Sequence, residues 1–400
     1  MTDTAPPIDA PPTTRRGRLQ RRLRRQSRTA GRDTAVAMAL TALVVGVVHG
    51  GGLLEGEPAA AAEMTGDATF RAVMVGDVMF GRHVERAAER HGHDWLLQEM
   101  RPVFAGADYV TGNLEQVITP DPDALPDADK LIHLASDERA AQALADAGFT
   151  TMALANNHLM DHGIPGLRDT IAALDEVGLS HVGAGASLQD AIEIDYQEHG
   201  ELTVATLAFS DAYVVGFVAL AFQGGVLSAE QDRASRLIRE ASANADLVIT
   251  HFHWGTEYGF AANRDQRELA EMAAASGADI VIGHHPHVLQ RVERIGDTLV
   301  FYSLGNFVFD QGWSRTRESA VARYQLRSDG RARVELLPIE IREGAPRLLS
   351  GPLAEYRRAR IFQRLGGGEG LAWRREAGML ITEVDHGRVV ATEGDVEATS

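Results

Sequence analysis

The sequence predicts an α/β fold, because stretches of strand and helix character alternate along most of the chain from Thr69 onward. Short apolar runs of strand length are separated by longer stretches that have apolar residues at helical spacing. Many of the apolar runs lead directly into an Asp, Asn or His residue. In open α/β sheets, the loops at the carboxyl ends of the strands build the functional site. The pattern therefore predicts both a fold class and the place of the site within it.

In the first half of the pattern, strands are expected where short apolar runs end at a glycine or a polar residue, at residues 70–75, 107–111, 150–155 and 180–182. Helices are expected at residues 138–148 and 167–177, which end at Gly148 and Gly178. Glycine is common just after a helix because it adopts the left-handed conformation without strain. The first half is thus a regular succession of strands and helices.

The second half continues this alternation and then changes character. Strands are expected at residues 202–209, 246–250, 279–282 and 299–303, and helices at residues 228–243 and 267–276. The period then drops to two at residues 320–326 and 332–339, which flank the turn Ser328-Asp329-Gly330. This combination predicts a β-hairpin. Residues 344–400 are weakly patterned, and no element is predicted there.

The charge is divided between a basic head and an acidic body. The 400 residues carry a net charge of −17, yet residues 1–32 hold nine arginines against Asp3 and Asp9, a net +7 that leaves −24 on the rest. An apolar run follows from Thr34 to Val48. We interpret residues 1–33 as a basic cytoplasmic tail, 34–54 as a signal-peptide core or membrane anchor, and 55–68 as a linker. The alternative is a basic tail followed by an ordinary buried helix.

Composition excludes several classes of protein. The acidic body argues against nucleic acid as a partner. The chain has no cysteine, so disulfides, thiolate zinc sites, iron–sulfur clusters and cysteine nucleophiles are excluded. Lys130 is the only lysine among 39 basic residues, which we attribute to codon usage in GC-rich DNA.

Five segments gather the residues most able to carry chemistry. They are Gly76-Asp77, Gly112 to Glu115, Asn156 to Gly163, His251 to Tyr258 and Gly283 to His287. Imidazole, carboxylate and carboxamide groups without sulfur suit divalent Mn, Fe, Zn or Mg. Two ions bridged by a carboxylate would clamp a phosphate and activate water, whereas one ion could polarise a carbonyl. His251 and His253 are two residues apart, which places both rings on one side of an extended segment.

Six motifs in this order resemble the CapA-type poly-γ-glutamate capsule synthesis family. They are G-D-V-M-F-G-R at 76–82, G-N-L-E at 112–115, N-N-H-L-M-D-H-G at 156–163, H-F-H-W-G-T-E-Y at 251–258, G-H-H-P-H-V-L-Q at 283–290 and S-L-G-N-F-V-F-D at 303–310. The resemblance implies a calcineurin-like metallophosphatase fold, a four-layer α/β/β/α sandwich, over residues 69–340, with 341–400 as a C-terminal extension. It also implies an anchored or secreted extracytoplasmic protein that works with a membrane synthetase complex on poly-γ-glutamate or another anionic substrate.

The resemblance also assigns roles to individual residues. It implies metal ligands at Asp77, Asn113, Glu115, Asn157, His251, His285 and His287, with His251 and His253 as alternatives for one position. We expect acid–base catalysis from His158, His253 and Glu257. We expect substrate contacts from Asp161, Trp254, Tyr258 and Asn306, although Trp254 and Tyr258 could equally be packing residues.

One departure from the phosphatase pattern leaves the number of ions and the reaction open. Phosphatases usually have Asp-x-His at the first motif, whereas Asp77 is followed by Val78 and Met79. A metal-dependent hydrolase of the capsule system is therefore one hypothesis. A secreted phosphoesterase unrelated to capsule, and a polymer-binding subunit without catalysis, are the others. An acidic body also repels an anionic polymer at long range.

Overall fold

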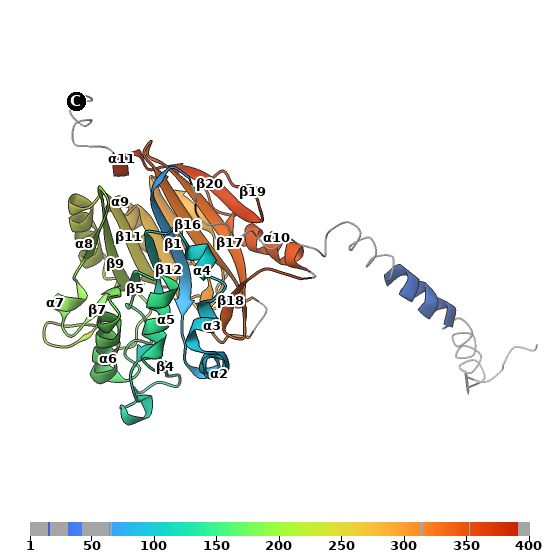
Figure 1. Ribbon diagram of the computed structural model, residues 1–400, viewed down its shortest axis with the longest axis horizontal. Coiled ribbons are helices and arrows are strands. Elements are labelled where there is room, and N and C mark those ends of the chain that lie inside the picture. Colours follow the sequence, from blue (N-terminus) through green and yellow to red (C-terminus); the bar gives the residue numbers. More distant parts are fainter. Residues whose placement is uncertain are drawn as a thin grey trace, which may run out of the picture. The chain divides into compact units, whose positions relative to one another are not determined.

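This computed structural model describes residues 15–16, 31–41, 64, 66–312, 315–351 and 353–390 (Figure 1). Most of the predicted basic tail, apolar run and linker lies outside the described residues, although residues 31–41 form a helix. Of the helices in the described part of the chain, none is both long and apolar enough to cross a membrane. The chain divides into two units, residues 1–56 with 351–355 and residues 57–350 with 356–400. The second unit contains the strands that carry the predicted site residues.

The larger of two main sheets has the strand order β19-β20-β17-β16-β1-β2-β5-β6, with β15 paired to β1 and β18 paired to β17. Its strands are β1 (Ala68–Val78), β2 (Tyr109–Leu114), β5 (Thr151–Ala153), β6 (Ser180–Val182), β15 (Asn306–Val308), β16 (Glu318–Arg327), β17 (Arg331–Arg342), β18 (Ala345–Leu348), β19 (Arg374–Glu376) and β20 (Met379–Asp385). Strands β1, β2, β5 and β6 are parallel, so their carboxyl ends meet at one edge.

The second main sheet has the order β13-β14-β12-β11-β9-β8. Its strands are β8 (Asp195–His199), β9 (Leu202–Ser210), β11 (Leu247–His253), β12 (Ile280–His284), β13 (Val292–Ile295) and β14 (Thr298–Phe301). The four central strands are parallel, and the edge strands β8 and β13 are antiparallel to their neighbours. Two short pairs lie outside these sheets, β3 (Val117–Ile118) with β4 (Ala135–Ser136) and β7 (Ala184–Gly185) with β10 (Gly225–Val226).

Helices cover the outer face of each sheet. The larger sheet is covered by α2 (Arg82–His91), α3 (His93–Leu97), α4 (Arg101–Phe104), α5 (Arg139–Ala147) and α6 (Gly163–Glu176). The second sheet is covered by α8 (Gln231–Asn244) and α9 (Arg264–Ala275), which lie beside β9 and β11 (Figure 1). The remaining helices are α7 (Leu188–Ala191), α10 (Ala354–Leu365) and α11 (Gly387–Val390), and Pro122–Ala124 forms a 3-10 turn.

The inner faces of the two sheets meet through small and polar side chains. Ala153, Ala155, Val182 and Ala208 form a small apolar cluster between the sheets. The Tyr109 hydroxyl lies 2.9 Å from the Thr206 hydroxyl on the facing sheet. Because small side chains let the sheets approach closely, the strands of both can contribute to one site at their common rim. The predicted α/β class and the four-layer α/β/β/α arrangement are confirmed.

The structure adds elements that the pattern did not predict. Helix α2 follows β1 directly and exposes mostly charged residues, so it lacks a long apolar stripe in the sequence. Residues 341–400, predicted as an extension, continue the larger sheet, because β18 and β20 both pair with β17. Strands β18 and β20 find their partners only through tertiary pairing, which a local pattern does not reveal.

Candidate metal centre

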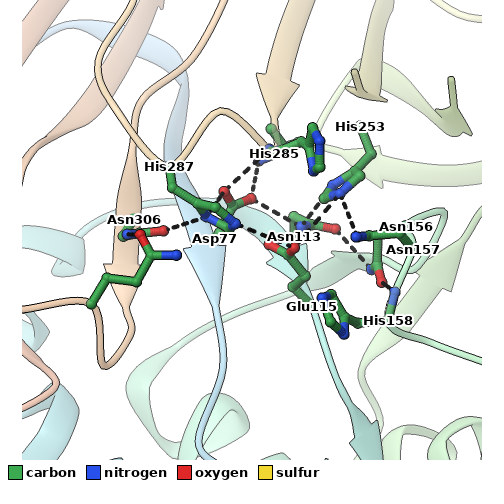
Figure 2. Close-up of polar contacts among 12 residues, drawn as sticks. Asp77, Asn113, Glu115, Asn156, Asn157, His158, His253, His285, His287 and Asn306 are labelled. Carbon is green, nitrogen blue, oxygen red and sulfur yellow. Dashed lines mark hydrogen bonds and ion pairs between the residues drawn. The ribbon is translucent and has the colours of Figure 1, made fainter. Parts of the chain in front are cut away.

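The carboxyl ends of strands from both sheets bring the predicted residues to one rim (Figure 2). In the larger sheet, Asp77 on β1 pairs in register with Asn113 on β2 and with Asn306 on β15. In the second sheet, His253 at the end of β11 pairs with His284 at the end of β12. The convergence expected from polar residues after strands therefore occurs, across two sheets instead of one.

Two glycines in the motifs permit this close arrangement. A Cβ atom on Gly76 would lie 1.7 Å from the carbonyl oxygen of Gly305, and one on Gly283 would lie 2.1 Å from that of Tyr302. No side chain fits at such distances, so glycine is required where these strands approach each other. This explains why a glycine stands just before Asp77 and just before His284.

The backbone at the rim is held in an unusual conformation. Tyr258, His285 and His287 have positive φ angles of 62°, 91° and 56°. Residues other than glycine rarely adopt this region, and such strain tends to gather at functional sites. The backbone N–H of His285 donates to Oδ2 of Asp77 over 3.2 Å, which helps to hold the loop.

Asparagine side chains connect the ligand candidates. Asn113 donates through Nδ2 to Oδ1 of Asp77 over 2.9 Å, and its own Oδ1 accepts from Asn156 over 3.1 Å. Asn157 Oδ1 lies 2.9 Å from Nε2 of His253. Both predicted asparagine ligands are thus engaged with neighbouring side chains in this arrangement. Asn156, which sequence reasoning did not select, also accepts from the backbone N–H groups of His158 and Leu159.

Two groups of side chains have the geometry to hold a divalent ion. One is Glu115, His285 and His287, and the other is Asp77, Glu115 and His253; within each group the potential ligand atoms lie within 4.8 Å of one another. Glu115 belongs to both groups. The residues therefore provide two adjacent positions with one shared carboxylate.

Glu115 supplies the strongest test of whether a cation fits. Its side chain is fully buried, and among the described residues neither carboxylate oxygen has a hydrogen-bond partner. The nearest imidazole nitrogens are His253 Nε2 at 3.6 Å and His287 Nε2 at 3.8 Å. An unsolvated carboxylate without donors costs several kcal/mol. A divalent ion would satisfy these oxygens, and the oxygen and nitrogen donors present suit such an ion.

The pKa values of the cluster reflect its burial and the close approach of its charged groups. Burial, followed by the negative charge of Asp77, raises the pKa of Glu115 well above its usual value. Burial alone would raise the pKa of Asp77, but hydrogen bonds with His284 and His287 hold it well below its usual value. Burial alone would lower the pKa of His287, but the charge of Glu115 and the hydrogen bond with Asp77 raise it to about 9.

Two other histidines of the cluster are kept neutral. Burial, with the nearby His285, lowers the pKa of His253 well below its usual value. Burial, with the nearby His287, lowers the pKa of His285 to about 4. Neutral imidazole is the form that binds a metal ion. These two side chains are therefore ready to act as ligands near neutral pH.

His158 is oriented by a group of three side chains. Its Nδ1 atom lies 2.7 Å from Oδ2 of Asp161, and Oδ1 of Asp161 accepts from Nζ of Lys130 over 2.6 Å. Lys130 also donates to the backbone carbonyl of Asn157 over 2.8 Å. Asp161 is fully buried, so it positions His158, whereas we had expected it to contact substrate. Codon usage explains why the chain has a single lysine but does not predict that Lys130 lies at the site.

The structure places His251 and Trp254 away from the ligand groups. His251 contacts Thr111 Oγ1 at 3.1 Å and His284 Nε2 at 3.0 Å, between the sheets. Its ring is on the same side as that of His253, but two residues correspond to about 7 Å along a strand, which leaves it deeper in the sandwich. Trp254 is fully buried in the core under α8 and α9, and its indole N–H donates to Tyr302 over 3.0 Å. It packs in the core and does not form a cavity wall.

The other expected substrate contacts divide into a positioning residue and two cavity residues. Asn306 is fully buried, and its Oδ1 lies 2.8 Å from Nδ1 of His287, which it orients. Glu257 and Tyr258 line a cavity of about 330 Å³ together with His158 and His287. Of the candidate ligands, His287 thus lines the cavity, and His158 lines it as well.

His284 was not selected from the sequence, although it stands in a quoted motif. Its Nδ1 atom lies 3.2 Å from Oδ1 of Asp77. It thereby links Asp77 to His251 in the interior. Two adjacent histidines at the end of a strand point to opposite sides, which suggests that one binds a metal ion and the other orients a ligand.

The sequence matches known proteins over most of this region. The family model described as bacterial capsule synthesis protein PGA_cap matches residues 71–311. The chain belongs to this family. It is 42% identical over 323 residues to the PGA biosynthesis protein CapA of Bacillus subtilis (strain 168), covering 80% of this chain and 84% of the relative. It is 41% identical over 324 residues to the capsule biosynthesis protein CapA of Bacillus anthracis, covering 79% and 78%.

Solved structures are similar at a greater distance. The calcineurin-like phosphoesterase YfkN of Bacillus subtilis is 14% identical, with a TM-score of 0.34, over 71% of this chain and 89% of that chain. A TM-score this low says nothing about the chemistry of the site. What this PGA_cap protein does must be inferred from its own residues and from its capsule-synthesis relatives.

Proposed function

We propose that this chain acts in the synthesis or export of poly-γ-glutamate as a metal-dependent hydrolase or transferase. The observation that carries the proposal is Glu115, a buried carboxylate without hydrogen-bond partners in the described part of the chain and shared by two ligand groups. The substrate class rests on the relatives, which are named as capsule and PGA biosynthesis proteins. A carboxylate polymer matches these names.

The residues at the rim would divide the chemistry between them. Asp77, Glu115, His253, His285 and His287 would hold one or two divalent ions. A bound divalent ion supplies Lewis-acid polarisation and activates water. His158 lines the cavity, and since Asp161 occupies its Nδ1 atom, Nε2 is the atom through which it can give or take a proton.

Metal content and turnover test the proposal together. The purified full chain is loaded with Mn²⁺, Fe²⁺, Zn²⁺ or Mg²⁺ and incubated with poly-γ-glutamate, and new amino termini are counted. We expect metal-dependent cleavage or transfer that is lost in Glu115→Gln and in His158→Gln. The matched control is Glu240→Gln, an exposed carboxylate on α8. A chain that binds no divalent ion contradicts the proposal.

Two alternative functions appear as distinct outcomes of the same experiment. Turnover of simple phosphodiesters without action on the polymer would indicate a phosphoesterase unrelated to capsule. Binding of metal and polymer without turnover of the polymer or of phosphodiesters would indicate a polymer-binding subunit. Both outcomes overturn the proposed reaction while leaving the metal site in place.

We also propose that residues 57–400 work outside the cytoplasmic membrane, next to a membrane-bound synthetase. The support is the arginine-rich segment at 15–32 followed by the apolar run at 34–48, which is typical of a signal peptide or an anchor. Protease treatment of spheroplasts tests this: the folded domain should be accessible from outside. The length of the mature chain then distinguishes an anchor from a cleaved signal.

A further inference from the structure

A second, larger cavity adjoins the one at the ligand groups. Its volume is about 640 Å³, and it shares His83, Phe309, Asp310, Gln311 and Gly312 with the smaller cavity. The two hollows therefore lie next to each other and share part of their lining. A chain-like substrate held at the ligand groups can extend from the smaller cavity into the larger one.

Arginines line this path. Arg82 faces the smaller cavity, and Arg86, Arg90, Arg317 and Arg342 line the larger one. The acidic residues on the larger cavity are Asp310 and Glu343. Over both cavities, five arginines face three acidic residues, Asp310, Glu343 and Glu257, so the path is cationic. Residues 63–400 as a whole contain 30 basic and 51 acidic residues. The path is a local exception to the acidic surface.

Part of this positive charge is not neutralised by neighbouring acids. Arg82 pairs with Asp310 at 3.1 Å, and Arg90 approaches Glu343 at 3.4 Å. Within the described residues, Arg86 makes no ion pair, and Arg317 is held by a hydrogen bond from its Nε to the carbonyl of Ile341 over 2.8 Å. Both guanidinium groups can therefore accept an external anion.

Close packing fixes the walls of the larger cavity. A Cβ atom on Gly344 would lie 2.9 Å from the Val84 side chain, so the turn after β17 sits tightly against α2. The N–H of Phe309 donates to the carbonyl of Gly344 over 3.2 Å. The arginines of α2 and of β17 are thus held in a fixed relation to the ligand groups.

The arginines of α2 also have a regular spacing. Arg82, Arg86 and Arg90 follow at four-residue intervals, which corresponds to about 6 Å along a helix. An extended α-linked residue has three backbone bonds and spans about 3.6 Å, so a γ-linked glutamate with five backbone bonds spans about 6 Å. The length of one extended γ-linked repeat therefore matches the rise between successive arginines, and every second carboxylate of a fully extended chain faces the same side.

We propose that this arginine-lined groove binds a γ-linked glutamate chain and feeds it to the ligand groups. The proposal rests on the proposed function for its substrate class. It removes the electrostatic difficulty of an anionic polymer on an acidic protein, because the arginines attract carboxylates locally. The ligand groups contact one repeat, and the groove holds the repeats that follow it.

Binding of labelled poly-γ-glutamate to the full chain, measured by fluorescence anisotropy, tests the groove. We expect Arg86→Gln combined with Arg90→Gln to weaken binding at least tenfold, and Arg317→Gln to weaken it further. Arg236→Gln combined with Arg239→Gln, on α8, removes the same charge elsewhere and should change the affinity less than twofold. An equal loss in both double variants means that only net charge matters, and overturns the proposal.

The choice of polymer and a metal-free variant keep the two proposals apart. We expect γ-linked polyglutamate to bind more tightly than α-linked polyglutamate or polyphosphate of equal charge; equal binding overturns the assignment. Glu115→Gln should lose the metal ion but still bind the polymer through the groove. If the chain binds metal and turns over the polymer, but the Arg86 and Arg90 substitutions do not change polymer affinity, the groove proposal is overturned and the proposed function stands. If the wild-type chain binds polymer through these arginines but takes up no metal ion, the proposed function fails and the groove stands.

Discussion

His284 Nδ1 lies 3.2 Å from Oδ1 of Asp77, and on its other side His284 Nε2 lies 3.0 Å from His251 Nδ1. His251 in turn contacts the Thr111 hydroxyl at 3.1 Å. This line of polar side chains runs from the space between the two sheets to the ligand groups. It places the His284 ring directly behind Asp77, where supporting side chains commonly orient metal ligands.

The first prediction concerns this line. We expect His251→Ala to weaken the affinity for a divalent ion about tenfold, because supporting residues typically contribute at that level. His251→Gln should restore part of the affinity, since its amide can still bond to His284. A competitive metal titration measures the effect. His181→Gln, a histidine outside the site, serves as the control, and unchanged affinity in His251→Ala would contradict the positioning role.

The second prediction is that Glu115→Gln affects stability differently in the absence and in the presence of a metal ion. Without metal, Glu115→Gln should be at least as stable as the wild type, because burial and Asp77 disfavour the ionised carboxylate. With metal, the wild type should gain about 2.7 kcal/mol at an ion concentration of 100 times the dissociation constant, and the variant should gain far less. Thermal unfolding with and without the ion measures both effects. A variant that is stabilised by metal as strongly as the wild type argues against Glu115 as a ligand.

The third prediction concerns the single lysine. The ammonium of Lys130 contacts Asp161, the carbonyl of Asn157 and the ring of His158, at 2.6, 2.8 and 3.2 Å. A planar guanidinium cannot reproduce a compact three-way contact. We expect Lys130→Met to cost about 1–3 kcal/mol in the free energy of unfolding, because Asp161 loses a charged donor. Lys130→Arg should not restore turnover.

Urea unfolding and turnover measure the effects at Lys130. The matched control is Arg236→Lys on the exposed face of α8, which should leave both unchanged. Full function in Lys130→Arg would show that codon usage alone explains why the chain has one lysine.

The fourth prediction is a pH dependence of stability away from the site. His386 accepts from Tyr324 at Nδ1 and donates from Nε2 to the carbonyl of Asp297, over 2.8 and 3.0 Å. Burial lowers the pKa of His386 to about 4. The folded state therefore requires the neutral ring, so its contribution is complete above pH 6.5 and is lost as the pH falls towards 4. The full effect is roughly 3 kcal/mol at most.

The test of this pH dependence is the difference between the wild type and His386→Gln. Asp279 lies in the same region, and burial raises its pKa to about 6, which makes the protein more stable as the pH falls from 6 to 4. This opposite contribution is common to both proteins and cancels in the difference. The difference should shrink as the pH falls from 7 to 4, and a constant difference would contradict the buried neutral ring.

The sequence predicted the alternating elements and the rim of the site because both depend on local pattern. Helix α5 ends before Gly148, whose φ of 99° is the left-handed conformation expected there. Asp77, Glu115, His253, His285 and His287 stand together because each ends or follows a parallel strand. Here local pattern and tertiary structure agree.

The remaining features depend on depth and on partners, which a linear pattern does not contain. His251 and His253 lie on the same side of β11. His251 lies deeper between the sheets and supports His284, whereas His253 lies at the rim and is a candidate ligand. Trp254 alternates to the opposite face and joins the core. Helix α2 has no long apolar stripe in its sequence, so the local pattern does not predict it. Only the structure shows that its arginines line the cavity.

The most direct test of the central claim is a crystal structure of the full chain soaked in Mn²⁺ and measured for anomalous scattering. The account predicts one or two peaks at about 2.0–2.3 Å from oxygens of Glu115 and from histidine nitrogens. His285 with His287, and Asp77 with His253, should complete the two positions. An anomalous map without a peak at Glu115 would contradict the account, whether or not Mn²⁺ is bound at another place in the crystal.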